Sequence, residues 1–202
     1  MTSPAPMKVC FVTVGATASF EPLVSAVLDG RFLASLGELG YTNLLVQYGK
    51  DGRPIFDRFL QDRDSEEAAT SHSIQVDGFD FNQAGLGREM RLAQENAAEG
   101  RRSGAIISHA GSGSILEALR LGIPLVVVPN SSLKDNHQEE LARELQKQGY
   151  VVASHYEQLP SAIRQAEDLR ARMMAWPPVD SVQTKRKQPL AGVMSDELGF
   201  LD

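Results

Sequence analysis

The segment 105–138 limits the possible folds more than any other part of the chain, because it contains a complete strand–helix–strand unit. Two short apolar runs, 105–108 and 125–128, predict buried strands, and residues 115–121 between them predict a helix. Two strands joined through a helix run parallel in one sheet. The glycine-rich sequence HAGSGS directly follows the first strand. The segment therefore predicts a parallel α/β sheet with a glycine-rich turn at its carboxyl edge.

The same alternation of strands and helices extends over most of the chain. Further apolar, β-branched runs predict strands at 8–14, 43–47, 73–79 and 150–153. Apolar residues at helical spacing predict helices at 20–36, 54–59, 84–99, 137–149 and 159–174. We therefore expect one Rossmann-like, doubly wound α/β domain with a mainly parallel sheet over residues 1–176.

The chain changes character after Trp176. Pro177 and Pro178 prevent a helix from continuing, and residues 181–189 are polar and basic. Residues 190–202 again carry apolar side chains at regular spacing, which predicts a short amphipathic helix that docks on the body or on a partner. The helix at 159–174 is a rival docking element. We expect residues 177–202 to form a C-terminal tail outside the main domain.

The composition argues against several classes of protein. The formal net charge of −6 disfavours a nucleic-acid binder, which usually presents a basic surface. Cys10 is the only cysteine and lies in an apolar run, so we expect a buried structural thiol and a reducing compartment. The sequence has no Cys/His cluster with metal-ligand spacing, no signal pattern, and no apolar stretch near the roughly 18–20 residues that span a bilayer. These features predict a cytoplasmic protein without a metal site.

The turn at 109–114 differs from the standard phosphate-binding and nucleophile motifs. It lacks the GK[ST] of a P-loop, the third glycine of GxGxxG and the GxSxG of a nucleophile elbow. Its remaining functional interpretation is a phosphate held by backbone N–H groups and by His109. The alternative is a tight turn whose glycines serve geometry alone. Its position at the carboxyl end of a parallel strand favours binding.

Two polar groups further along the chain have both a structural and a functional interpretation. Ser114 and Glu117 match the S-x-x-E capping box, but the Glu117 carboxylate can equally accept the two hydroxyls of a ribose. The sequence DNHQ at 135–138 can cap the next helix or bind sugar hydroxyls. Its density of hydrogen-bonding groups exceeds what a cap needs, which favours a sugar.

A second strand-to-helix turn can contribute to the same site. Gly15, Ala16 and Thr17 can offer backbone N–H groups and a hydroxyl to the phosphates. Phe79 ends a strand near the expected crevice, where an aromatic ring can stack on a base, although core packing is the usual role of a single aromatic. These features together are typical of a nucleotide-sugar site.

The ordered motifs resemble the donor-binding half of the GT-B glycosyltransferases. HAGSGSILE, GIPLVVVP and DNHQ follow one another here, and the frame H-x-G-x-x-S-x-x-E is shared with members of that class. The chain resembles the small cytosolic subunits of the eukaryotic dolichol-linked N-acetylglucosaminyltransferases, through FVTVGATASFEPLV, LLVQYGK, GFDF and LKDNHQEELA as well. The matches are spread over residues 8–155.

This resemblance implies a reaction and a partner. N-acetylglucosamine would pass from the donor substrate UDP-N-acetylglucosamine to dolichyl-diphosphate-N-acetylglucosamine, without a further cofactor. The reaction is the second step of the lipid-linked oligosaccharide pathway for N-glycosylation, at the cytosolic face of the endoplasmic reticulum. A membrane-anchored subunit would bind the lipid acceptor and recruit this chain, with docking through the C-terminal segment.

The resemblance also implies which residues contact the donor. His109 is the expected catalytic residue, because it would stabilise the departing UDP. The expected contacts are Gly15, Ala16, Thr17, His109, Gly111, Ser112 and Gly113 for the diphosphate, Phe79 for uracil, Glu117 for ribose, and Asn136, His137 and Gln138 for the sugar. No residue stands out as the general base, which in GT-B relatives usually lies on the acceptor half. Two other functions remain open: a non-catalytic nucleotide-sugar-binding module and a stand-alone nucleotide-sugar epimerase or hydrolase.

Overall fold

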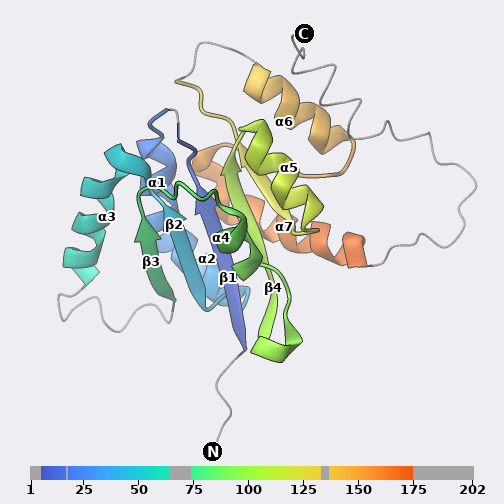
Figure 1. The fold of residues 1–202 in the computed structure, drawn as a ribbon, viewed down its shortest axis with the longest axis horizontal. Coiled ribbons are helices and arrows are strands. Elements are labelled where there is room, and N and C mark those ends of the chain that lie inside the picture. The colour runs from blue at the N-terminus through green and yellow to red at the C-terminus, as the bar shows by residue number, and fades with distance from the viewer. Residues whose placement is uncertain (1–5, 17, 64–73, 133–136, 175–202) are drawn as a thin grey trace, which may run out of the picture.

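The computed structural model describes residues 6–16, 18–63, 74–132 and 137–174 (Figure 1). Thr17, Asn136 and the predicted tail at 177–202 lie outside these ranges. Within them, six parallel strands form one sheet in the order β3-β2-β1-β4-β5-β6. The strands are β1 (Met7–Thr13), β2 (Asn43–Gln47), β3 (Gln75–Phe79), β4 (Arg101–His109), β5 (Leu125–Val128) and β6 (Val152–Ala153). The expected doubly wound α/β fold is confirmed.

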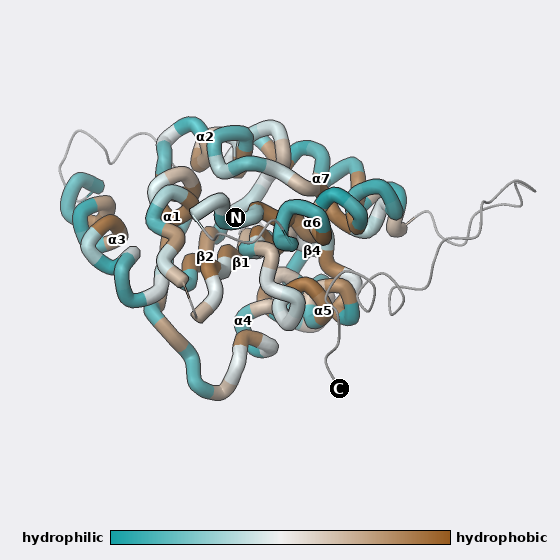
Figure 2. Tube along the Cα trace, turned by 90° about the horizontal axis from the view of Figure 1, so that it is seen from above, coloured by the Kyte–Doolittle hydropathy of each residue, from teal (hydrophilic) through white to brown (hydrophobic). Residues whose placement is uncertain are grey.

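Helices cover both faces of the sheet, as the view from above shows (Figure 2). One face carries α1 (Glu21–Leu28), α2 (Gly30–Glu38), α3 (Gly49–Arg63) and α7 (Leu159–Met174). The other carries α4 (Gly87–Leu92), α5 (Ser112–Arg120) and α6 (His137–Lys147). Successive residues of β1 point to opposite faces, so that Cys10 and Val12 enter the first core and Phe11 the second. A strand buried on both faces has no polar side, which explains the continuous apolar run of β1.

Three of the predicted helices differ most from the structure in their limits. The helix predicted at 20–36 is divided at Asp29, whose extended backbone ends α1 and whose side chain accepts the Arg31 N–H at 2.9 Å to cap α2. The helix predicted at 54–59 is the longer α3, which includes Pro54. The region 84–99 contains only α4 and a short 3-10 turn, Ala97–Glu99. Apolar spacing found these helices but did not locate their ends.

The order of the strands places a crevice between β1 and β4. β2 and β3 continue the sheet on one side of β1, and β5 and β6 continue it on the other side of β4. Chain connections therefore leave the sheet in opposite directions at this pair, and ligands of open α/β sheets bind at such a point outside the carboxyl ends of the strands. β1 ends there at Thr13 and β4 at His109.

A buried polar cluster fastens α7 to the sheet away from this crevice. Glu167 of α7 is bonded by the Nζ of Lys8 at 3.0 Å, by the hydroxyl of Tyr41 at 2.6 Å and by the guanidinium of Arg170. Burial by itself raises the pKa of Glu167, but the hydrogen bonds from Arg170, Tyr41 and Lys8 outweigh it and hold the pKa below its usual value. The cluster therefore requires an ionised carboxylate.

We expect Glu167→Gln to lower the free energy of unfolding by about 3 kcal/mol, because it leaves buried Lys8 without a counter-charge. Urea unfolding at neutral pH measures this loss. A carboxyl group with a lowered folded-state pKa stabilises the fold above its unfolded pKa, and this contribution is lost as the pH falls through the folded-state pKa. The difference between wild type and variant should therefore shrink in acid.

The exposed pair of Glu38 and Arg164, at 2.9 Å, provides the control for this variant. Glu38→Gln should change the unfolding free energy by less than about 0.5 kcal/mol, because solvent screens an exposed ion pair. Equal losses in Glu38→Gln and Glu167→Gln would contradict the structural role of the cluster.

Candidate functional site

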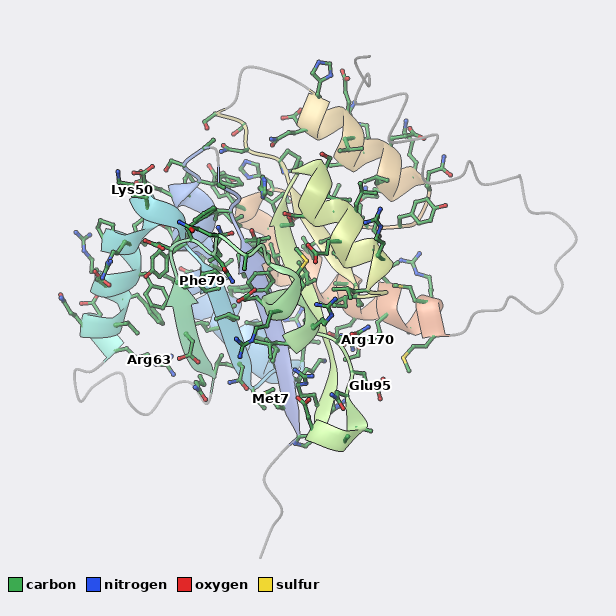
Figure 3. The ribbon with its side chains drawn as sticks, in the orientation of Figure 1. Met7, Lys50, Arg63, Phe79, Glu95 and Arg170 are labelled. Carbon is green, nitrogen blue, oxygen red and sulfur yellow. The ribbon has the colours of Figure 1, made fainter. Side chains whose placement is uncertain are left out.

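The carboxyl edge of the sheet contains two adjoining hollows. The first, the switch-point cavity, has a volume of about 410 Å³ and lies between the turn after β1, the loop after β3 and the turn between β4 and α5. Gly15, Gln47, Phe81, His109 and Gly111 are among its lining residues. The second hollow, of about 340 Å³, shares Gly15 and Phe81 with it and extends to Tyr48 and Lys50. Lys50 lies at this edge of the sheet, whereas Met7 lies at the opposite edge (Figure 3).

His109 lies between two glycines that approach it too closely for any side chain. A Cβ atom on Gly15 would lie 2.5 Å from the Cε1 and Nε2 atoms of His109, and one on Gly111 would also collide with the ring. Gly15 has a φ of +82°, in the left-handed region that favours glycine. The two glycine-containing turns, far apart in the sequence, thus hold one imidazole between them.

The environment of His109 keeps its imidazole neutral. Burial lowers the pKa of His109, and the nearby Thr13 backbone opposes this effect only in part. The Nδ1 atom is buried and has no hydrogen-bond partner among the described residues. A buried polar atom without a partner is unusual in native proteins and indicates a functional role or a missing ligand.

The first turn of α5 borders the switch-point cavity and has no side-chain cap. Gly111 is the N-cap residue, no side chain caps the helix, and Ser112, Gly113 and Ser114 of its first turn line the cavity. Uncapped N–H groups together with the positive end of the helix dipole attract anions. The capping-box interpretation of Ser114 and Glu117 is wrong, because Ser114 is the third helical residue and not the N-cap.

Glu117 lies one turn further along α5, outside the wall of the switch-point cavity. Its Oε1 atom lies so close to Gly87, at the start of α4, that a Cβ there would collide with it. The carboxylate is therefore placed near the first residue of α4, where negative charge also stabilises a helix. This contact gives Glu117 a structural role that the sequence did not suggest.

Phe79 packs against the core, whereas the Phe81 side chain is exposed. Phe79 packs in parallel against Phe11, with ring centroids 6.4 Å apart, and belongs to the border of the second core. Phe81 is 55% exposed and lines both hollows. The aromatic ring open to a ligand is thus two residues beyond the one that the sequence singled out.

The described part of the DNHQ segment lies at the start of α6. The His137 side chain is exposed, with its Nδ1 atom 3.9 Å from the Glu140 carboxylate. The Gln138 Oε1 atom accepts the backbone N–H of Asn130 at 3.0 Å, and the buried Asn130 side chain donates to the Ser19 carbonyl at 2.9 Å. Gln138 and Asn130 thus connect the loop after β5 to the turn after β1, and neither His137 nor Gln138 lines the switch-point cavity.

The structure thus brings only part of the predicted set together. The predicted residues in the wall of the switch-point cavity are Gly15, Ala16, His109, Gly111, Ser112 and Gly113. Sequence reasoning missed Gln47, a buried side chain that lines the same cavity. The signal that indicates it is a polar residue at the carboxyl end of an otherwise apolar strand, NLLVQ.

The neutral imidazole of His109 and the backbone N–H groups at the start of α5 suit this cavity to binding an anion.

Over the described ranges, no three His, Cys, Asp or Glu side chains are grouped closely enough to hold a metal ion. In that same part of the chain, none of the helices has the length and apolar character needed to cross a membrane. Cys10 is fully buried, and burial raises the pKa of its thiol, so the predicted structural cysteine is confirmed.

Comparisons with known proteins agree with this geometry. Residues 9–174 match the model of the glycosyltransferase family 28 C-terminal domain. The UDP-N-acetylglucosamine transferase subunit ALG13 of Cryptococcus neoformans is 37% identical over 94% of this chain and 96% of its own length. An NMR structure of ALG13 matches with a TM-score of 0.57 and 29% identity, over 80% of this chain and 84% of that one.

A more distant structure shows which part of a larger fold this chain represents. MurG of Acinetobacter baumannii, 16% identical, matches with a TM-score of 0.52 over 86% of this chain but only 43% of its own. The fold is therefore that of one half of a GT-B glycosyltransferase, as the sequence predicted. From its family match and its full-length relatives, the chain belongs to glycosyltransferase family 28 and, within it, to the ALG13 family of UDP-N-acetylglucosamine transferase subunits.

Proposed function

We propose that the chain is the donor-binding, catalytic subunit of the enzyme that moves N-acetylglucosamine from UDP-N-acetylglucosamine to dolichyl-diphosphate-N-acetylglucosamine. The observation that carries the proposal is the switch-point cavity, where His109, Gly15 and the uncapped start of α5 face one space. The names of the curated relatives support the donor. The lipid acceptor and a place at the cytosolic face of the endoplasmic reticulum follow from the family resemblance.

The residues of the cavity suggest a division of roles. The backbone N–H groups at 112 and 113 bind the diphosphate, which Gly15 faces without a side chain in the way, and Glu117, one turn beyond the cavity wall, accepts the ribose hydroxyls. The acceptor hydroxyl displaces UDP directly at the anomeric carbon, so negative charge grows on the departing phosphate. The free N–H groups and the His109 imidazole stabilise this charge without reorganising, because the fold already holds them in place. No metal or other cofactor takes part.

A membrane-anchored partner completes the enzyme in this proposal. Displacement needs a base to deprotonate the acceptor hydroxyl. We assign His109, the one imidazole among the described residues of the switch-point cavity, to the departing phosphate, and Lys50, Asp51 and Asp80 line the adjoining hollow instead, so we place the base on the partner. The relatives are named as subunits, which supports a partner of some kind. Docking through residues 190–202 is favoured over docking through α7, whose apolar face and Glu167 are already used inside this domain.

A transfer assay tests the function. The full chain is mixed with UDP-N-acetylglucosamine and a phytanyl-diphosphate-N-acetylglucosamine acceptor, with and without the candidate membrane subunit. Transfer only in the presence of the subunit is the expected result. Binding of the nucleotide sugar without any transfer would leave a binding module, and sugar turnover by the isolated chain would favour an epimerase or hydrolase.

Truncation before Leu190 tests the docking surface. The shortened chain should keep its thermal midpoint and its affinity for UDP-N-acetylglucosamine, because it retains all of the described helices and strands. It should no longer co-purify with the membrane subunit. Retained co-purification would move the docking surface to the body, with α7 as the first candidate.

Glu117→Gln separates the ribose contact from the contact with α4. We expect the affinity for UDP to fall about tenfold, because a carboxamide accepts the two ribose hydroxyls less strongly than a carboxylate. Calorimetry of UDP binding and thermal unfolding should be measured on the same preparation. A lowered melting temperature with unchanged affinity would assign Glu117 to the stabilisation of α4 alone.

A further inference from the structure

We propose that Gln47 is a positioning residue that holds the Gly15 turn in place beneath His109. The inference deepens the function proposed above and rests on it for its catalytic consequence. Gln47 is the last residue of β2 and is only 1% exposed, yet it contributes to the wall of the switch-point cavity. Burying a carboxamide is costly unless its hydrogen bonds are made inside the protein, so its partners identify its role.

Gln47 and Thr13 together bind both backbone polar groups of Gly15. The Gln47 Nε2 atom donates to the Gly15 carbonyl at 3.2 Å, and the Gly15 N–H donates to the Thr13 Oγ1 atom at 3.3 Å. The Thr13 hydroxyl in turn donates to the Gln47 Oε1 atom. The three groups form a closed ring of hydrogen bonds, so Gly15 cannot shift without breaking one of them.

The same cycle of hydrogen bonds also limits the space available to the His109 imidazole. The Gly15 α-carbon faces the imidazole so closely that one methyl group would not fit between them. Thr13 is paired with Gln47 on β2 and with Ser108 on β4, so the ends of three strands meet at this point. A change at Gln47 is therefore transmitted to His109 through one residue.

A glutamine suits this position because its amide both donates and accepts. Glutamate is acceptor-only when ionised, so it could not donate to the Gly15 carbonyl, and it would place a buried negative charge beside the diphosphate site. Methionine fills a similar volume but makes neither hydrogen bond. Valine at Thr13 removes the hydroxyl with little change of shape, whereas serine keeps it.

The test measures the His109 imidazole by NMR in the full chain, together with donor binding and transfer by the complex. Gln47→Met and Thr13→Val should both move the His109 ring resonances and its pKa, and should lower kcat/KM for UDP-N-acetylglucosamine by about tenfold or more. Thr13→Ser should restore the wild-type values. Ser35→Ala is the control, because Ser35 is buried and hydrogen-bonded to Arg31 of α2, away from the cavity.

The outcomes separate this inference from the proposed function. Loss of stability in Gln47→Met and Thr13→Val, with His109 resonances and donor affinity unchanged as in Ser35→Ala, would overturn the positioning role. A wild-type complex that transfers no sugar would overturn the proposed function instead, while the NMR comparison would still decide the role of Gln47. Should Gln47→Met fail to fold, Thr13→Val and Thr13→Ser test the same cycle of hydrogen bonds through its second side chain.

Discussion

Sugar transfer by the complex is expected to fall by about 10²–10³-fold when His109 is replaced by alanine, because the departing phosphate loses a prearranged hydrogen-bond donor. The fold should persist, since the Nδ1 atom of His109 makes no hydrogen bond within the described residues. His155→Ala is the matched control: this imidazole is exposed, lies 3.5 Å from the Glu157 carboxylate and lines neither hollow. Steady-state transfer rates and melting temperatures of both variants provide the measurement.

The pH dependence of donor binding gives a second readout of His109. Burial lowers the pKa of the free imidazole, whereas a bound diphosphate favours the protonated form and raises it. The affinity for UDP-N-acetylglucosamine should therefore rise as the pH falls through the pKa of the complex, and become constant below the pKa of the free protein. Both phosphates of this donor are esterified and do not titrate there. His109→Ala should abolish the dependence, and a variant that retained it would exclude His109 as the titrating group.

The second large effect is expected for Gly15→Ala, at the opposite side of the same imidazole. Alanine at a φ of +82° costs about 1–2 kcal/mol, and its methyl group would lie 2.5 Å from two ring atoms of His109. The imidazole must move, and misplacement by about 1 Å costs roughly 10²-fold in rate. We therefore expect both lower stability and a loss of transfer, measured by urea unfolding and by the transfer assay.

Two further variants make this prediction specific. Gly37→Ala in α2 has no heavy atom within 4 Å of the added methyl group and should leave transfer unchanged. The double variant Gly15→Ala/His109→Ala should lose less stability than the two single changes added together, because removing the ring also removes the clash. Additive losses would show that Gly15 is needed for its backbone conformation alone and not for its contact with His109.

Several elements were predicted correctly because their signals are local. The strands at 43–47 and 125–128 and the helix at 159–174 have the same limits in the sequence prediction and in the structure. Short apolar runs bounded by glycine or polar residues describe strands that are buried on both faces. Repeated strand–helix alternation then leaves few topologies, since parallel connections are almost always right-handed.

The errors arose where a local pattern allowed a competing interpretation. The S-x-x-E pattern at Ser114 left a capping box open as one of two interpretations, but α5 begins at Ser112, with Gly111 as an uncapped N-cap. The helix at 20–36 kept its apolar spacing across Asp29, where the backbone in fact becomes extended. A sequence pattern shows the helical spacing of apolar residues, but it does not show at which residue the helical hydrogen bonds begin.

The sequence by itself determined the parallel α/β class, the family and the glycines that follow β1 and β4, because these depend on residue type and order. Only the tertiary structure decided which residues meet. The switch between β1 and β4 brings Gly15 to His109, places Phe81 instead of Phe79 in the cavity wall, and gives Gln47 both of its partners. Such contacts join residues more than 30 positions apart, so they depend on strand pairing that no local spacing encodes.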